Sequence, residues 1–592
     1  MQRRFGELCH QIGDWEGAHR AYAAALQASA ALFDESGAAE SRERELADSR
    51  GYALLAAYAA ARRGQLNDAV CCAEIGRARS LVDTLAALEV AFSHASDTVR
   101  AEVTQARLSI SDLEQKMREA EASDPAVIAS NLVAKLADGI GCDPAVLQSR
   151  VSSESVQQLD AGLAEYVGLS NELRQAHADL RQALARARKE SGEILPAALS
   201  STDIVAIASN AGYPIIYLFA TIHGSMALAV SPAGSIEAIQ LDLITSDDTS
   251  ALLNGRANRA GFLDGATYGN EERFGASLEE CLRMLRERVV APIVEWIAKQ
   301  DFERAVLVPL GSLGLLPIHA ATAHGEPAVS YVPSARALSR ALASWRRKVD
   351  AQSVLFAVGN PSRSDEPALR CAVAEVKGVA SMFGQGSRAT VLIGPQAEVS
   401  AVRAGVRGAT YLHFACHARF RPSDPLESML LLAGENRLTL GELFRGELDV
   451  SAARLVVLSA CQTANTEFRQ RPDESLGFPA ALLVAGVPGV VSTLWPVDDR
   501  VAALFCSRFY EEHLHRGQAP AVAVCKAQHW LQNAGAEELG KSVESLRTTL
   551  DPDDDEVDEA MSVLWRDLAA RDPDHKPFSA AQFWAAFTYT GA

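Results

Sequence analysis

Short apolar runs alternate with helical segments in the second half of the chain, and this alternation limits the possible folds more than any other feature. The helical segments cover residues 369–382, 399–405, 476–484, 500–513 and 519–533. Runs that are apolar on both faces and joined by helices are typical of a mostly parallel sheet covered by helices on both sides. Six runs are predicted as strands: 353–360, 389–394, 411–417, 454–461, 489–497 and 583–591.

Two of these predicted strands end on reactive side chains. The run YLHFACH ends at His417, and the run LVVLSAC ends at Cys461. In a parallel sheet, residues just past the carboxyl ends of neighbouring strands converge on one crevice. The pair therefore suggests a cysteine nucleophile with a histidine partner.

Length and composition limit the remaining possibilities. A chain of 592 residues is expected to hold about three or four domains. Its net charge of −19 opposes direct binding to nucleic acid or to anionic lipid. The ten cysteines include no CxxC pair, and the start MQRRFGELC lacks the apolar core of a signal peptide. These features predict reduced thiols in a cytoplasmic protein.

One uncharged stretch, residues 477–497, is long enough to cross a bilayer in principle. Its prolines and glycines would leave backbone groups unpaired in lipid. The stretch is instead predicted to form a buried helix, a turn and a buried strand, and no membrane association is expected.

The N-terminal segment contains two similar helical motifs. Each begins with a glycine at a turn, Gly13 or Gly64, and has a small alanine five residues later, Ala18 or Ala69. The motifs look like tetratricopeptide repeats, although two copies 51 residues apart are a degenerate match. A plain helical hairpin is the alternative, and upstream repeats missing from this chain would also explain the low number of copies.

A heptad pattern follows. Apolar residues in steps of four and three predict a coiled-coil seam, and a second helix at about 156–188 is expected to fold back on it as an antiparallel arm. His177 in this second helix is interpreted as a half-exposed seam residue rather than a ligand. The seam residues of the first helix are Val99, Val103, Ala106, Ile110, Leu113, Met117 and Ala120.

Residues 196–348 are β-rich at first, with a hairpin predicted around His223 and Gly224. A long amphipathic helix at 277–300 and a strand at 305–311 follow. His223, His319 and Cys281 in this region are interpreted as packing residues, so no second nucleophile is expected here.

Five sequence blocks, in the order in which they occur along the chain, resemble those of the CHAT family. This family consists of caspase-like cysteine peptidases associated with tetratricopeptide repeats. The resemblance covers about residues 200–592, and the N-terminal motifs agree with it. The blocks are HFACHA (413–418), DPLESMLLLAG (424–434), LVVLSACQT (455–463), ESLGFPAALLVAGVPGVVSTLWPVDD (474–499) and FWAAFTYTG (583–591).

The resemblance implies that Cys461 is the nucleophile and His417 its partner, and that a non-catalytic, pseudo-caspase half precedes the active half. Backbone N–H groups of Ala418 and Cys461 are the expected oxyanion donors. The predicted domains are TPR-like repeats (1–92), a helical arm (93–195), the pseudo-caspase half (196–348) and the active half (349–592).

Two departures from the caspase pattern affect specificity. Ala418 stands where caspase relatives commonly have glycine, and Ser459 stands where the motif QAC[RQG]G has glutamine. Cleavage after aspartate is therefore not expected. A basic or polar residue is weakly preferred in the substrate at the position before the scissile bond. Helix capping is the alternative role for the acidic candidates for the substrate pocket, above all for Asp498 and Asp499. The candidate pocket residues are Ser459, Asp473, Glu474, Asp498 and Asp499.

No metal or cofactor is predicted. His413 and His417 have an HxxxH spacing that could bind zinc on a helix, but on a strand they lie roughly 13 Å apart. His413 is expected on the same face as His417 in a buried, hydrogen-bonded position, and Cys416 is expected in the core on the opposite face. The chain also lacks the GxxxxGK[ST] phosphate cradle of nucleotide hydrolases.

The leading hypothesis is a regulated endopeptidase that cleaves a protein substrate. A regulatory protein or ribonucleoprotein would bind the N-terminal repeats, and by analogy with the family the chain would act in bacterial defence, CRISPR-associated immunity or programmed cell death. The alternatives are a non-catalytic scaffold that uses the caspase-like fold for binding, and acyl transfer by the same pair.

Overall fold

The computed structural model divides the chain into two compact units. The first contains residues 1–23, 51–81 and 198–592, and the second contains residues 24–50 and 82–197. The structure describes residues 2–35, 51–75, 95–123, 153–191, 198–241, 244–255, 261–262, 271–384, 388–421, 425–460, 463, 477–551 and 554–592.

The second unit contains an antiparallel pair of long helices, α7 (Asp97–Ser123) and α10 (Ser153–Ser191). Val99 and Val103 near the start of α7 pack with Leu184 near the end of α10, whereas Met117 packs with Leu173. The antiparallel arm is therefore present, and seam residues such as Val103 and Leu113 are buried in it. His177 is 8% exposed, so it is buried rather than half-exposed as predicted.

The first unit begins with two helical pairs, α1 (Gln2–Gln11) with the start of α2 (Trp15–Glu35), and α4 (Tyr52–Arg62) with α5 (Leu66–Ile75). The turns contain Gly13 and Gly64, whose positive φ angles of 76° and 74° suit a residue without a Cβ. Ala18 and Ala69 are fully buried, as close helix packing requires. The helical pairs are present, and their assignment as tetratricopeptide repeats stays a prediction.

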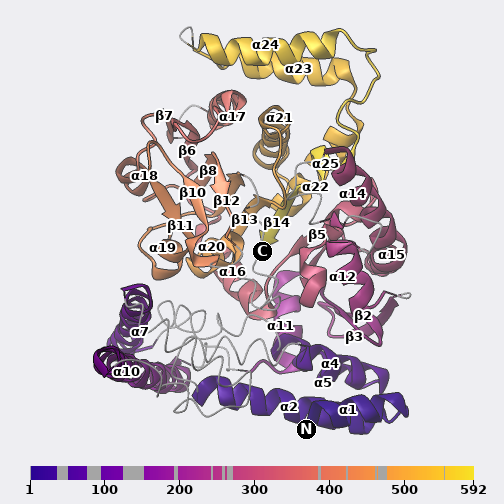
Figure 1. The fold of residues 1–592 in the computed structure, drawn as a ribbon. Coiled ribbons are helices and arrows are strands. Elements are labelled where there is room, and N and C mark those ends of the chain that lie inside the picture. The colour runs from indigo at the N-terminus through magenta and orange to yellow at the C-terminus, as the bar shows by residue number, and fades with distance from the viewer. Residues whose placement is uncertain are drawn as a thin grey trace. The chain divides into compact units, whose positions relative to one another are not determined.

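A mixed, mostly parallel sheet of eleven strands forms the centre of the first unit (Figure 1). Its order is β3-β2-β1-β4-β5-β14-β13-β12-β8-β6-β7. The antiparallel pairs are β1–β2, β2–β3 and β13–β14. The strands are β1 (Ile215–Thr221), β2 (Gly224–Val230), β3 (Ile236–Leu241), β4 (Arg304–Pro309), β5 (Ala328–Tyr331), β6 (Val354–Pro361), β7 (Arg388–Gly394), β8 (Tyr411–Ala415), β12 (Leu455–Ser459), β13 (Gly489–Thr493) and β14 (Phe587–Gly591).

Helices cover both faces of this sheet, as the doubly apolar runs predicted. Alternate strand residues such as Val457 and Val456 enter two different cores. The first core includes residues of α17 (Arg370–Ser381), α21 (Asp499–Tyr510) and α22 (Pro520–Asn533), and the second includes residues of α18 (Val399–Gly405), α19 (Leu440–Arg445) and α20 (Phe478–Val484).

A small three-stranded sheet lies between β8 and β12 in the sequence. It consists of β9 (Ala418–Arg419), β10 (Met429–Leu431) and β11 (Arg437–Thr439). Other helices of the unit are α11 (Ser201–Ala211), α12 (Ser246–Asn254), α14 (Glu271–Leu285), α15 (Ala291–Lys299), α16 (Ala335–Lys348), α23 (Ala536–Arg547), α24 (Asp555–Ala569) and α25 (Ala581–Trp584).

The uncharged stretch at 477–497 forms the buried helix α20, a turn at Gly486 and the buried strand β13. This matches the prediction, although the strand ends at Thr493 rather than at residue 497. Within the described part of the chain, no helix combines the length and apolar character needed to cross a membrane.

Candidate active site

The carboxyl ends of β8 and β12 lie side by side. The two strands are parallel neighbours, and Ser459, the last residue of β12, is paired with Ala415, the last residue of β8. Side chains that follow parallel strands meet at the same edge of the sheet. Three predicted site residues, Cys461, Asp473 and Glu474, lie outside the described residues.

The imidazole of His417 is held by the segment before α17. Its Nε2 lies 2.8 Å from the carbonyl oxygen of Pro367. Because a carbonyl only accepts, this contact assigns the proton to Nε2 and leaves Nδ1 as the acceptor in the neutral ring. A carboxylate oxygen of Glu366 lies 4.0 Å from Nδ1, and the His417 side chain is 18% exposed.

The backbone N–H of Ala418 points away from the neighbouring strand β10. Leu431 donates its N–H to the His417 carbonyl at 2.9 Å, so residues 417 and 431 form a hydrogen-bonding pair of the small sheet. In an antiparallel ladder, hydrogen-bonded pairs alternate with pairs whose N–H and C=O groups point away from the partner strand. Ala418 and Leu430 form the next pair, which is of the second kind. The N–H of the half-buried Ala418 is therefore directed away from β10.

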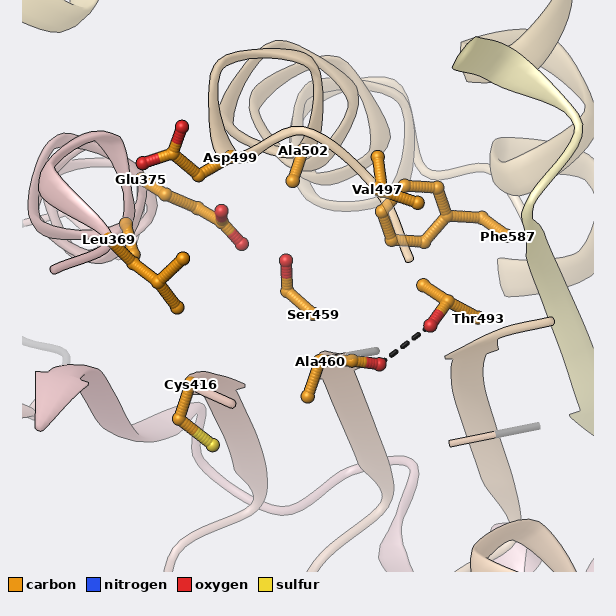
Figure 2. A pocket seen from close by; sticks show the side chains of 11 residues that line it. Leu369, Glu375, Cys416, Ser459, Ala460, Thr493, Val497, Asp499, Ala502 and Phe587 are labelled. Carbon is orange, nitrogen blue, oxygen red and sulfur yellow. Dashed lines mark hydrogen bonds between the residues drawn. The ribbon is translucent and has the colours of Figure 1, made fainter. Parts of the chain in front are cut away.

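Two threonines fix the end of the β12 segment. Thr493 at the end of β13 donates its hydroxyl to the Ala460 carbonyl at 2.6 Å (Figure 2). Thr463 donates to the same oxygen at 3.0 Å. The Thr463 oxygen also accepts the Thr493 N–H at 3.2 Å. No local sequence pattern indicated this arrangement of Thr463 and Thr493.

A pocket opens beside the same strand ends (Figure 2). It encloses about 370 Å³ of empty space, part of it open solvent. Its mouth contains half-buried residues such as Leu369 and Ser459, and its floor contains buried residues such as Glu375 and Ala460. The full lining is Leu369, Ala372, Glu375, Cys416, Ser459, Ala460, Thr493, Val497, Asp499, Ala502 and Phe587.

The acidic candidates that the structure describes have different surroundings. Asp498 caps α21 through the Arg500 N–H, and its hydrogen bonds with Arg500 outweigh burial and lower its pKa. Asp499 lines the pocket and accepts the Cys371 N–H at 3.0 Å. Burial raises the pKa of Asp499, and the charges of Asp498 and Glu375 add to this effect.

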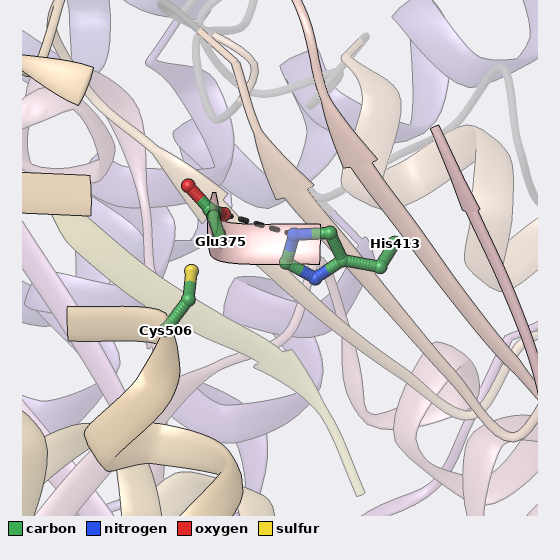
Figure 3. Close-up of side chains that lie close together, drawn as sticks. All are labelled: Glu375, His413 and Cys506. Carbon is green, nitrogen blue, oxygen red and sulfur yellow. Dashed lines mark hydrogen bonds and ion pairs between the residues drawn. The ribbon is translucent and has the colours of Figure 1, made fainter. Parts of the chain in front are cut away.

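A buried polar cluster lies next to the pocket floor (Figure 3). Glu375 of α17, His413 of β8 and Cys506 of α21 place their polar atoms within 4.8 Å of one another. Burial, followed by the charge of Glu375, raises the pKa of the Cys506 thiol well above its usual range. Sequence reasoning anticipated a buried, hydrogen-bonded His413 but missed both partners.

The donor types of this cluster would suit a zinc ion. However, Nε2 of His413 lies 2.8 Å from Glu375 Oε1, and Cys506 bonds to both Glu375 and Ser459. The three side chains therefore have hydrogen-bond partners in one another, and their contacts are explained without an ion.

Burial also affects other described thiols. It raises the pKa of Cys281 and of Cys371 to about 12, and that of Cys525 to about 11. Thiols of this kind are mostly protonated at neutral pH and are poor nucleophiles. For Cys281 this agrees with the packing role that the sequence predicted.

Comparison with known proteins places residues 279–592 in a family. Residues 279–592 match the family model described as the CHAT domain. A comparison with curated protein sequences gives no match.

Solved structures with a related arrangement include two crystal structures of the Saccharomyces cerevisiae separase–securin complex. One matches with 9% identity and a TM-score of 0.36, over 89% of this chain and 46% of that chain. The other matches with 10% identity and a TM-score of 0.37, over 99% of this chain and 48% of that chain. The Arg-specific cysteine proteinase gingipain R matches with 9% identity and a TM-score of 0.30, over 56% of this chain and 69% of that chain. The chain spans about half the length of the separase chains.

Proposed function

Because the chain belongs to the CHAT domain family, we propose that it is a regulated cysteine endopeptidase with Cys461 as the nucleophile and His417 as its partner. The observation that supports this most is the pairing of Ser459 with Ala415. In each strand the reactive residue follows two positions after this pair, as the sequence shows. On this proposal, Cys461 follows the sheet at the same edge as His417.

The surroundings of His417 suit the role of a general base and acid. With Nε2 bonded to Pro367, Nδ1 is the nitrogen that can take the proton of the Cys461 thiol. The thiolate then attacks the carbonyl carbon of the scissile peptide bond. The resulting imidazolium gives its proton to the departing amine, and water hydrolyses the acyl-enzyme to release the acid and the free thiol.

The tetrahedral intermediate requires fixed donors for its oxyanion. The N–H of Ala418, directed away from β10, is one proposed donor, and the N–H of Cys461 is the other. A donor of this type contributes about 3 kcal/mol to the stabilisation of the transition state. The mechanism that we propose requires neither a metal ion nor a cofactor.

A contact within the first unit supports regulation through the N-terminal helices. Glu74 of α5 accepts the N–H groups of Ala335 and Arg336 at the start of α16, at 3.0 and 3.1 Å. At the other end of α16, Lys348 donates to the carbonyls of Ala453 and Gly486, just before β12 and β13. A partner protein or ribonucleoprotein on the N-terminal helices could thus affect the strands that lead to the site.

The physiological role that we propose, a bacterial defence or cell-death effector, rests on analogy with the family. An unrestrained endopeptidase would harm the cell that makes it. We therefore expect the chain alone to be less active than the chain with its partner.

The test compares new protein N-termini in cells that carry the intact chain, the Cys461→Ala variant or the Cys281→Ala variant. Cys281 is buried in α14, so its substitution controls for the loss of a thiol. New N-termini should appear with the intact chain and with Cys281→Ala and be absent with Cys461→Ala. If Cys461→Ala keeps the cellular effect, the chain acts as a scaffold instead.

A further inference from the structure

We propose that the pocket beside Ser459 binds a positively charged side chain of the substrate and that Glu375 on its floor determines this specificity. The proposal rests on the proposed function, because it assigns the residue whose carbonyl Cys461 attacks. It predicts cleavage after lysine or arginine.

The position of the pocket suits the side chain next to the scissile bond. Ser459 and Ala460, which precede Cys461 directly, form part of its wall. The carbonyl of Ala460 is fixed by Thr463 and Thr493. A substrate held at the end of β12 would therefore have a pocket with a well-defined wall beside it.

The lining of the pocket suits a side chain with an aliphatic stem and a charged end. Its lining includes apolar groups of α17, α21, β14 and the loops before the two helices, together with the carboxylate of Glu375. Lysine and arginine bury their methylene groups along apolar surface and keep the charge at the far end. The apolar lining residues are Leu369, Ala372, Val497, Ala502 and Phe587.

The charge of the pocket is one-sided. Its lining contains two acidic residues, Glu375 and Asp499, and no lysine, arginine or histidine among the described residues. Nearby arginines are engaged elsewhere: Arg419 pairs with Glu366, and Arg500 pairs with Asp498. An aspartate side chain would meet repulsion here, whereas a cation would gain a partner.

Glu375 is the better of the two acids for this role. Asp499 lies near the mouth and its carboxylate caps the N-terminal turn of α17 through the Cys371 N–H. Glu375 is 1% exposed, and its carboxylate faces Ser459 across the pocket (Figure 2). His413 and Cys506 hold this carboxylate from behind, so it is pre-oriented for a ligand.

The first test measures cleavage by the purified full chain of fluorogenic tetrapeptides that differ only at the residue before the scissile bond. Substrates with arginine or lysine should have a kcat/KM at least about 10-fold above those with glutamine or methionine, and aspartate should not be cleaved. In Glu375→Gln, the value for arginine and lysine should fall about 10- to 100-fold, while that for glutamine and methionine changes less than about 3-fold. A purely structural role of Glu375 would lower all of these values together.

Glu398→Gln is the matched control, because Glu398 is exposed before α18 and makes no cap hydrogen bond. It should leave the preference unchanged. Preferred cleavage after an apolar, polar or acidic residue in the intact chain would overturn the proposal and leave the peptidase function standing.

A second test does not depend on catalysis. Calorimetry on the Cys461→Ala chain should detect binding of n-butylguanidine and at least about 10-fold weaker binding of its neutral isostere n-butylurea. Adding Glu375→Gln should abolish this difference. Equal binding of the two compounds to the Cys461→Ala chain would overturn the pocket assignment. Selective guanidine binding without cleavage of any peptide would instead count against the peptidase function alone.

Discussion

Nε2 of His413 and Oε1 of Glu375 lie 2.8 Å apart, in side chains that are 0% and 1% exposed. The pair connects β8 to α17 beneath the pocket. A buried polar pair of this kind is costly to break, because the remaining partner loses both water and its hydrogen bond.

His413→Leu should therefore lower the free energy of unfolding by about 3–5 kcal/mol. The double variant His413→Leu with Glu375→Leu should lose less than the single variant, because no polar group is then left unpaired. Guanidinium-induced unfolding measures the free energy of unfolding of the single and of the double variant. A double variant that is less stable than His413→Leu would contradict this account of the pair.

Thr493→Val should reduce kcat by about 5- to 20-fold, because the Ala460 carbonyl loses one of its two hydroxyl donors. The stability cost should be modest, about 1 kcal/mol, since Thr463 still serves the same oxygen. Steady-state kinetics and thermal unfolding separate the two effects. Thr390→Val on the exposed part of β7 is the control and should change neither.

His319 should make the protein sensitive to acid. Burial lowers its pKa to about 4, and it bonds to Tyr331 and to the Ala585 carbonyl. Between pH 6.5 and 4 the unfolded state binds more protons than the folded state, so stability falls as the pH is lowered, by up to about 3 kcal/mol. His319→Gln should flatten the dependence of the unfolding midpoint on pH in this range. The exposed His515→Gln should not.

Neighbouring aspartates should respond to pH with opposite signs. The raised pKa of Asp499 means that its ionised form weakens the fold, so Asp499→Asn should raise the unfolding midpoint at pH 7 and have little effect near pH 3. The lowered pKa of Asp498 means that its charge stabilises the fold above the unfolded pKa. Asp498→Asn should therefore lower the midpoint at pH 7, and this loss should shrink as the pH falls. The same sign for both variants at pH 7 would refute the assignment.

The strands at the site, though not their order, follow from local sequence features. Short runs such as 411–417 and 455–461 are apolar on both faces, and this pattern depends only on burial. Ser459 and Asp499 line the pocket, and their role in binding a substrate side chain stays a prediction. Asp498 has the capping role that was given as its alternative.

Other features depend on tertiary contacts that no local pattern encodes. Glu375, His413 and Cys506 come from three separate elements. The single glutamate in the apolar face of α17 was a signal that could have identified the cluster. The predicted helix at 277–300 contains a π-helical turn, Arg286–Val290, just before Pro292, which has no N–H to donate to the preceding turn. The run 583–591 begins as the last part of α25 and only then becomes β14.

The position of β14 has a consequence for how the molecule assembles. Thr590 pairs with Tyr331 of β5 on one side and with Val490 of β13 on the other. Until residues 587–591 have been synthesised, no strand lies between β5 and β13 to join the two parts of the sheet. Once β13 has been made, a nascent chain holds two half-sheets that stay unjoined until β14 follows, and the peptidase that we propose cannot be fully assembled before then.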